Sequence, residues 1–207
     1  MDNDQLAELR IFGIVLQYPD DVKKGNKDNK YPDEMDFLVQ YEPRNKFIRN
    51  LALKQEGNTL VLFQFVEKHG KILYDMINNK DSERKVFFVH GGTDTEQREN
   101  IRRITEGESD AIIVASYGTF STGINIKNLH NIIFASPTKS RIRNLQSIGR
   151  GLRRGEEKVF CNLYDIGDDL TWKTRKNFTL HHMIERIKIY NDELFDYKLI
   201  KVDLNVQ

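Results

Sequence analysis

The sequence predicts an α/β fold in which helices cover both faces of a parallel β-sheet. Short runs of apolar residues alternate along the chain with stretches of helical periodicity, and these runs are apolar on both faces. Such strands are typical of parallel sheets that are buried on both sides. The length of 207 residues fits one domain of this kind with extra segments at its two ends.

The N-terminal segment, residues 1–42, is predicted to be an extension of strand, loop and helix. Residues 9–18 are apolar and rich in β-forming residues, which indicates a strand. Residues 20–30 are polar and predict a solvated loop or hairpin tip. Helical periodicity follows over residues 33–55, where Pro43 is placed to begin a second helix in its first turn.

Residues 43–170 carry the regular alternation and are predicted to form the core domain. Apolar runs indicate strands at residues 59–65, 85–90, 111–115, 131–135 and 158–164. Helices are expected between them, including one over residues 66–79 and one over about 140–152. Thr93 and Glu96 have the spacing of a capping box, which predicts that another helix begins there.

Residues 171–207 are predicted to form a C-terminal appendage of one helix and one strand. The apolar positions of the helix include Leu180, Ile184, Ile187 and Leu194. Residues 197–204 alternate in part and indicate the strand. His181 and His182 are adjacent and point to different sides of a helix, so we expect no metal site there.

The composition excludes several protein classes. The net charge of +1 argues against a polybasic nucleic-acid binder, so any contact with DNA must come from a local patch. The single cysteine, Cys161, lies in an apolar run and excludes a disulfide framework or a zinc cluster. No apolar stretch approaches the roughly 20 residues that span a bilayer. We therefore expect a cytoplasmic protein without a membrane partner.

Unusual polar residues follow three of the predicted strands. The carboxyl ends of parallel strands form the ligand surface of an open α/β sheet. These positions hold Gln64, the pair His90-Gly91, and residues 116–125. They are therefore site candidates, although strand ends and helix caps also collect polar residues for structural reasons.

A second group of candidates falls on the helix predicted over about residues 140–152. Gln146, Gly149, Arg150 and Arg153 are spaced three and four residues apart, so they share one helical face. Two guanidinium groups beside a glycine suit a polyanion such as a nucleoside triphosphate, because arginine offers planar, bidentate donors. The alternative interpretation is a solvated basic helix end.

Together these motifs resemble those of superfamily 2 helicases. The pattern Q-x-x-G-R-x-x-R at residues 146–153 resembles motif VI of that family. Companion elements stand in the family's order: VLFQF at residues 61–65, His90-Gly91 with Gln97 and Arg98, and ASYGTFSTGIN at residues 115–125. The resemblance covers about residues 44–170. It implies a RecA-like three-layer sandwich, the second motor domain of such enzymes.

The resemblance implies roles at the ATP site. Arg150 and Arg153 would reach the phosphates of ATP, with at least one acting as an arginine finger. Gln146 would align their helix at the interdomain cleft. The nucleotide-binding residues that the resemblance implies are Gly123, Asn125 and Gly149. Asn125 stands where many relatives carry an aspartate, so it can form a hydrogen bond but brings no charge.

The resemblance also implies contacts with DNA, mainly with its phosphates, because a translocating motor cannot depend on sequence. Ser116 stands where family members contact a strand phosphate with Thr or Ser. Lys139, Arg141 and Arg143 form a basic cluster just before motif VI, where a solvated helix start would look the same. The predicted DNA-binding residues are Gln64, His90, Gly91, Ser116, Tyr117, Lys139 and Arg141.

A complete motor also needs a phosphate-binding loop that ends in Gly-Lys-Ser/Thr, and this sequence contains none. The family carries that loop on a preceding RecA-like domain, which we expect to be a partner. ATP and Mg²⁺ would bind mainly there, the isolated chain would be inactive, and the chain opens where that domain would end. Residues 33–36, DEMD, imitate the family's acidic motif but predict a charged helix start.

The leading hypothesis is the second motor domain of an ATP-dependent DNA helicase or translocase that acts on branched DNA. One alternative is a non-catalytic nucleic-acid-binding module with the same fold. Such a module would have no use for Arg150 and Arg153, which favours the motor. The other alternative is the motor half of an RNA helicase or a restriction enzyme, and these residues do not decide between DNA and RNA.

Overall fold

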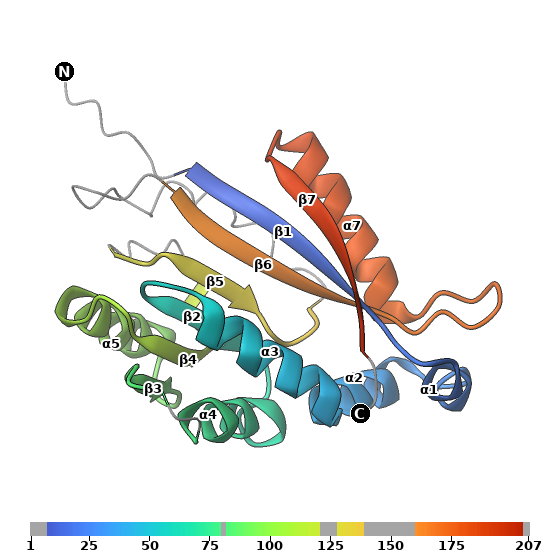
Figure 1. Ribbon diagram of the computed structural model, residues 1–207, viewed down its shortest axis with the longest axis horizontal. Coiled ribbons are helices and arrows are strands. Elements are labelled where there is room, and N and C mark those ends of the chain that lie inside the picture. The colour runs from blue at the N-terminus through green and yellow to red at the C-terminus, as the bar shows by residue number, and fades with distance from the viewer. Residues whose placement is uncertain (1–7, 80–81, 121–127, 139–159, 205–207) are drawn as a thin grey trace.

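The computed structural model describes residues 8–79, 82–120, 128–138 and 160–204 (Figure 1). Within these residues the strands are β1 (Glu8–Gln17), β2 (Thr59–Phe63), β3 (Val86–Val89), β4 (Ile112–Ser116), β5 (Asn131–Phe134), β6 (Phe160–Asp169) and β7 (Tyr197–Asp203). They form one seven-stranded sheet in the order β3-β4-β2-β5-β6-β1-β7. Every neighbouring pair is parallel, which confirms the predicted fold class.

Helices cover both faces of this sheet. The described helical elements are α1 (Asp20–Gly25), α2 (Tyr31–Gln40), α3 (Glu42–Lys54), the π-helix η1 (Val66–Gly70), α4 (Lys71–Asn78), α5 (Asp94–Gly107), the 3₁₀ turn η2 (Tyr117–Phe120) and α7 (Phe178–Asp192). One core cluster joins a face of the sheet to α2, α3 and α4. The other cluster joins the opposite face to α5 and α7. This is the predicted three-layer arrangement.

The burial of the central strand β2 explains why four of its five residues are apolar. All five of its residues are buried. Leu60 and Leu62 lie in the cluster with α5 and α7, whereas Val61 and Phe63 lie in the cluster with α3 and α4. Burying each such side chain contributes about 1.5–3 kcal/mol. Residues 60–63 of this strand, which face helices on both sides, are therefore all apolar, while Thr59 at its start is buried and polar.

The two end segments complete the sheet. β1 pairs with β6 over ten residues, and β7 pairs with the outer edge of β1 (Figure 1). Residues 1–42 and 171–207 were predicted to flank the core as an extension and an appendage. The described part of each segment supplies a strand to the common sheet, β1 from the first and β7 from the last.

The described residues also correct three local predictions. Residues 20–30 are not simply a loop, because α1 forms there with two aspartates in its first turn and two lysines in its last turn. The strand expected at residues 158–164 continues to Asp169. The buried face of α7 is Thr179, Met183, Arg186 and Tyr190. Of the positions predicted as its apolar stripe, Leu194 is 90% exposed.

Several of the predicted helix starts are confirmed. Pro43 lies in the first turn of α3. Thr93 and Glu96 form the capping box of α5. Residues 33–36 lie in the first turns of α2, as predicted for the charged string DEMD. The helix predicted over about 140–152 lies outside the described residues. No described helix combines the length and apolar character that crossing a membrane requires.

A buried cluster of Asp168, Arg44 and Tyr18 lies on the face covered by α3. The Arg44 guanidinium donates to both carboxylate oxygens of Asp168, with N···O distances of 2.8 and 3.1 Å. The Tyr18 hydroxyl donates to the same carboxylate at 2.6 Å. Burial, reinforced by the negative charge of Asp168, raises the pKa of Tyr18 well above its ordinary value. The hydroxyl therefore stays protonated as a donor.

An equivalent cluster of Asp165, Arg186 and Tyr190 lies on the opposite face, under α7. Arg186 donates to both oxygens of Asp165 at 2.9 Å, and Tyr190 donates to one of them at 2.6 Å. Asp165 and Asp168 are three residues apart on β6, so their side chains point to opposite faces of the sheet. We call these two groups the Arg–Asp–Tyr clusters.

Both clusters hold the segment that leaves β5. Arg44 donates its remaining terminal nitrogen to the carbonyl of Ala135 at 2.7 Å. Arg186 does the same to the carbonyl of Thr138 at 2.8 Å. Residues 135–138, called the exit segment below, are therefore gripped from both faces of the sheet. A segment bound in this way has little freedom to change direction.

A buried histidine adds a third attachment to the exit segment. His69 Nε2 lies 2.9 Å from Asn45 Oδ1, and its Nδ1 lies 2.6 Å from Ser136 Oγ. An amide oxygen only accepts, so Nε2 carries the proton and Nδ1 accepts from the serine hydroxyl. Burial, followed by the nearby Arg44 charge, lowers the pKa of His69 well below its usual value. The neutral form fits this network.

We predict that Asp168→Ala lowers the free energy of unfolding by about 3–5 kcal/mol, because it leaves Arg44 buried without its counter-charge. The exposed pair of Glu42 and Lys46 provides the control. Glu42→Ala should leave the unfolding midpoint essentially unchanged, because exposed ion pairs are weak. Urea titration of both variants measures this difference. Equal, small effects would contradict the assigned role of Asp168.

We predict that the free energy of unfolding decreases when the pH is lowered under about 6.5. One reason is that His69 stays neutral in the folded protein but binds a proton in the unfolded chain. Stability is therefore present above the unfolded-state pKa and is lost as the pH falls. His69→Gln should flatten this dependence by up to about 1.4 kcal/mol per pH unit. Unfolding curves at several pH values test this. Curves that stay parallel from neutral to acidic pH would contradict it.

Candidate nucleic-acid and nucleotide interface

The carboxyl edge of the sheet brings together the polar residues that follow β2, β3 and β4. Gln64 follows β2 and is exposed, and its backbone N–H donates to Ser136 Oγ at 2.9 Å. This bond joins the end of β2 to the exit segment of the neighbouring strand β5. The side chain of Gln64 stays available to a ligand at this edge.

Ser116 and Gln97 come from two different sequence motifs and meet in the fold. Ser116 ends β4 and is half-buried, while Gln97 lies on the buried side of α5. Ser116 Oγ donates to Gln97 Oε1 at 2.6 Å. Sequence reasoning quoted Gln97 only as part of a family pattern and gave it no role. The contact shows that Gln97 sets the direction of the Ser116 hydroxyl.

The loop after β3 is exposed and built around two glycines. Gly91 and Gly92 have φ values of +75° and +73°, which side chains other than glycine rarely adopt. A Cβ on Gly92 would also lie 2.6 Å from Glu96 Oε2, so a larger residue would disturb the cap of α5. His90 is exposed beside Phe88, with ring centroids 4.2 Å apart. His90 and Gly91 thus lie on the surface at the carboxyl edge.

The structure places the side chain of Tyr117 in the core. It is 1% exposed, and its hydroxyl donates to the carbonyl of Ser136 at 2.8 Å. A DNA contact through this side chain does not fit that position. Tyr117 instead forms a further bond to the exit segment. Gly118 follows it, and a Cβ there would collide with the Asp94 carboxylate, which explains the small residue.

Eight of the predicted site residues lie outside the described part of the chain: Gln146, Gly149, Arg150, Arg153, Gly123, Asn125, Lys139 and Arg141. Most of them lie between two described segments of the chain. The exit segment ends at Thr138, and β6 begins at Phe160. In the described residues, no three His, Cys, Asp or Glu side chains gather as a metal-binding group.

Sequence reasoning missed the residues that hold this edge together. Arg44 and Arg186 looked like ordinary charged positions on helices, and Ser136 belonged to no motif. One signal was present, since Asp165 directly follows the apolar run of the predicted strand. An aspartate that continues a buried strand requires a buried cation as its partner.

Comparison with known proteins places the chain in a family. A family model for the helicase conserved C-terminal domain matches residues 43–155. The ATP-dependent DNA helicase UvsW of Enterobacteria phage T4 is 39% identical over 99% of this chain and 43% of the relative. The crystal structure of T4 UvsW matches with a TM-score of 0.80 over 97% of this chain and 43% of that one.

More distant proteins share parts of the sequence or only the fold. The putative ATP-dependent helicase IRC3 of Saccharomyces cerevisiae is 26% identical over 80% of this chain and 24% of the relative. The DNA-bound restriction-modification enzyme LlaBIII has a TM-score of 0.58 at 15% identity, over 97% of this chain and 16% of that one. The chain spans less than half the length of these relatives. Because the family model covers more than half of its residues, the chain belongs to the helicase conserved C-terminal domain family.

Proposed function

We propose that this chain is the second motor domain of an ATP-dependent DNA helicase or translocase that acts on branched DNA in recombination, repair or replication-fork processing. The observation that carries the proposal is the similarity to a phage DNA helicase over 99% of the chain. The meeting of Ser116 with Gln97 at the carboxyl edge supports it. A phage origin would place the protein in the host cytoplasm.

The proposed ATP chemistry divides between two domains. ATP and Mg²⁺ bind mainly to a first RecA-like domain, and the metal neutralises charge on the phosphates. Arg150 and Arg153 contact the phosphates from this chain, while Gln146 aligns them. Gly123, Asn125 and Gly149 line the nucleotide. The exit segment supports this division, because it anchors the chain just before these arginines and fixes where their segment begins.

The proposed DNA contact at Ser116 depends on the orientation of Gln97. In the described arrangement the serine proton is directed to Gln97 Oε1. If the Gln97 amide turns by half a rotation, its Nε2 donates to Ser116 Oγ instead. The serine hydroxyl then points its proton at a DNA phosphate. Gln64, His90 and Gly91 flank this position, and Lys139 and Arg141 add positive charge.

No observation favours the other candidate functions. DEAD-box proteins such as Dbp5 share the fold at 11% identity, with a TM-score of 0.55. The restriction enzyme LlaBIII shares it at 15% identity. Similarity at this level concerns the fold alone, and many activities use one fold.

We predict that the chain alone does not hydrolyse ATP and that assembly with a first helicase domain restores DNA-stimulated hydrolysis. Arg153→Ala in the assembly should reduce kcat by about 10³–10⁵, the usual effect of losing an arginine finger. Arg103→Ala, an exposed arginine on α5, is the matched control and should keep the wild-type rate. Phosphate release with and without single-stranded DNA measures all four samples.

Two outcomes of this assay would overturn the proposal. Hydrolysis by the isolated chain at helicase-like rates would mean that it holds a complete nucleotide site. Full activity of Arg153→Ala in the assembly would mean that this arginine contacts no reacting phosphate.

We predict that Gln97→Glu weakens binding of single-stranded DNA more than Gln97→Ala does, because a carboxylate cannot donate to Ser116 and repels phosphate. Ser116→Ala should weaken binding by about tenfold, with the salt dependence unchanged, because the serine carries no charge. Fluorescence anisotropy with a labelled oligonucleotide measures both. Gln40→Glu, on the exposed end of α2, is the control. Equal affinities for Gln97→Glu and wild type would exclude the switch.

A further inference from the structure

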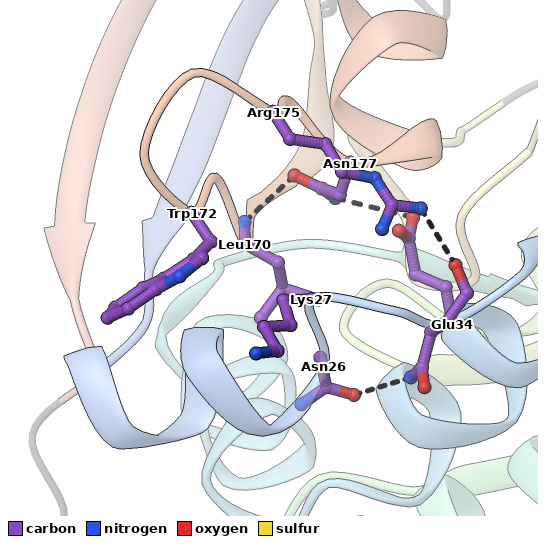
Figure 2. A pocket seen from close by; sticks show the side chains of 8 residues that line it. Asn26, Lys27, Glu34, Leu170, Trp172, Arg175 and Asn177 are labelled. Atoms are coloured by element: carbon purple, nitrogen blue, oxygen red, sulfur yellow. Dashed lines mark hydrogen bonds between the residues drawn. The ribbon is translucent and has the colours of Figure 1, made fainter.

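A surface hollow lies between the α1–α2 connection and the turn of residues 170–177 that follows β6 (Figure 2). Asn26, Lys27 and Asn29 line one wall. Trp172 and Arg175 reach it from the turn. The hollow lies at the carboxyl ends of β1 and β6, the same edge of the sheet as Ser116, but it involves no helicase motif.

The turn that carries Trp172 has a defined shape. Trp172 and Arg175 exchange two backbone hydrogen bonds of 3.0 Å. Leu170 N–H donates to Asn177 Oδ1 at 2.9 Å, which closes the turn at its base. Lys173 at the tip has a φ of +54°. At this angle the backbone of a lysine has a higher conformational energy than that of a glycine. A strained position that presents a charged side chain is typical of functional turns.

The two walls of the hollow are tied to each other. Arg175 donates to the carbonyl of Asn29 at 3.1 Å. Glu34 of α2 is 3% exposed and accepts from the backbone N–H groups of Phe178 and Thr179, at 3.1 and 2.7 Å. It thereby caps the first turn of α7 directly after the turn. The hollow is therefore a preformed feature, and binding there requires little ordering.

Several exposed lysines and arginines border this hollow. Residues 22–31 and 171–177 contain seven lysines and arginines against Asp28, while Asp20, Asp21, Asp33 and the buried lining residue Glu34 flank the first range. The cations that are exposed are Lys24, Lys27, Lys30, Lys173, Arg175 and Lys176. This is a local basic patch of the kind that a nearly neutral DNA-binding chain requires.

We propose that this hollow is a second contact surface for single-stranded DNA, separate from the helicase motifs. Trp172 is the only tryptophan in the chain and is half-buried at the rim. Its indole provides a face on which an unpaired base stacks, while Lys27, Lys173 and Arg175 contact the flanking phosphates. An aromatic side chain among cations is the usual construction of single-strand binding surfaces.

Single-stranded DNA fits these features better than a duplex does. Stacking on Trp172 requires a base that is free of its partner, which duplex DNA does not offer. The choice of DNA rests on the proposed function. A strand that passes Ser116 along the carboxyl edge would meet the hollow at the ends of β6 and β1. The surface would then hold a strand that the motor has separated.

Trp172 itself supplies the first readout. Titration of the 207-residue chain with single-stranded oligothymidine should quench its fluorescence in a saturable manner. The quench should weaken as salt is raised, and a duplex of equal length should compete poorly. Absence of quenching at concentrations where labelled oligothymidine binds the chain would overturn the stacking role.

Charge reversal tests the patch with a matched control. Lys27→Glu/Lys173→Glu should weaken binding of labelled oligothymidine by about tenfold or more and reduce the salt slope by about 1.4. Lys54→Glu/Lys198→Glu reverses two exposed lysines at the amino edge of the sheet and should bind as the wild type does. Trp172→Ala should reduce the affinity for oligothymidine by about tenfold, and Trp172→Phe should keep most of the affinity. Equal binding by the two double variants would overturn the proposal.

ATP hydrolysis separates this inference from the proposed function. In the assembly with a first helicase domain, Lys27→Glu/Lys173→Glu should keep its ATPase at saturating DNA but need about tenfold more DNA to reach it. An unchanged DNA requirement would overturn the second surface alone. An assembly without any DNA-stimulated hydrolysis would overturn the proposed function, whatever the oligonucleotide titrations show.

Discussion

Two buried arginines that grip one segment from opposite faces of the sheet hold this structure together at its carboxyl edge. Asp165 and Asp168 on β6 each bind an arginine and a tyrosine, and each arginine reaches on to a carbonyl of the exit segment. Buried charges are costly unless they are paired and fully hydrogen-bonded. The clusters meet that condition, so their contribution is better described as fixing one arrangement than as adding stability. Because both originate from one strand, β6 and the exit segment are positioned as a unit.

This constraint connects the fold to the proposed motor. The exit segment also accepts the hydroxyl proton of Tyr117, and its Ser136 hydroxyl joins the backbone of Gln64 to the ring of His69. The ends of β2, β4 and β5 are therefore tied together beside Ser116 and ahead of the predicted arginines. The same rigid edge of the sheet would then position both a DNA contact at Ser116 and a phosphate contact by Arg150. A structural element that both ligands contact is one physical route by which their binding can be coupled.

Most of the fold followed from the sequence because each strand is a short apolar run and several helices begin at recognisable caps. The predicted runs agree with β2 to β5 to within about two residues, the boundary error usual for such patterns. Pattern reasoning stopped β6 too early because Asp165 and Asp168 look like the start of a loop. Of the apolar positions named for α7, Ile187 packs against the core, but pattern reasoning missed Arg186, which is buried against Asp165. The pairs Asp165–Arg186 and Arg44–Asp168 are 21 and 124 residues apart in the sequence, so no local pattern indicates them. At the site, Ser116 and Gln64 were found from strand ends, whereas Ser136 and the role of Gln97 depend on tertiary contacts.

The most direct test of the central claim is hydrogen exchange at the exit segment. The backbone N–H groups of Ala135 and Ser136 both donate to the carbonyl of Leu62, at 3.0 and 3.3 Å. Asp165→Ala removes the carboxylate that holds Arg186 against the exit segment. The amide of Val114 in the buried strand β4 serves as an internal reference for global opening. The account predicts that Ala135 and Ser136 lose protection well beyond any loss at Val114. Equal loss at all three amides, or no loss, would show that the clusters stabilise the domain without fixing the exit segment.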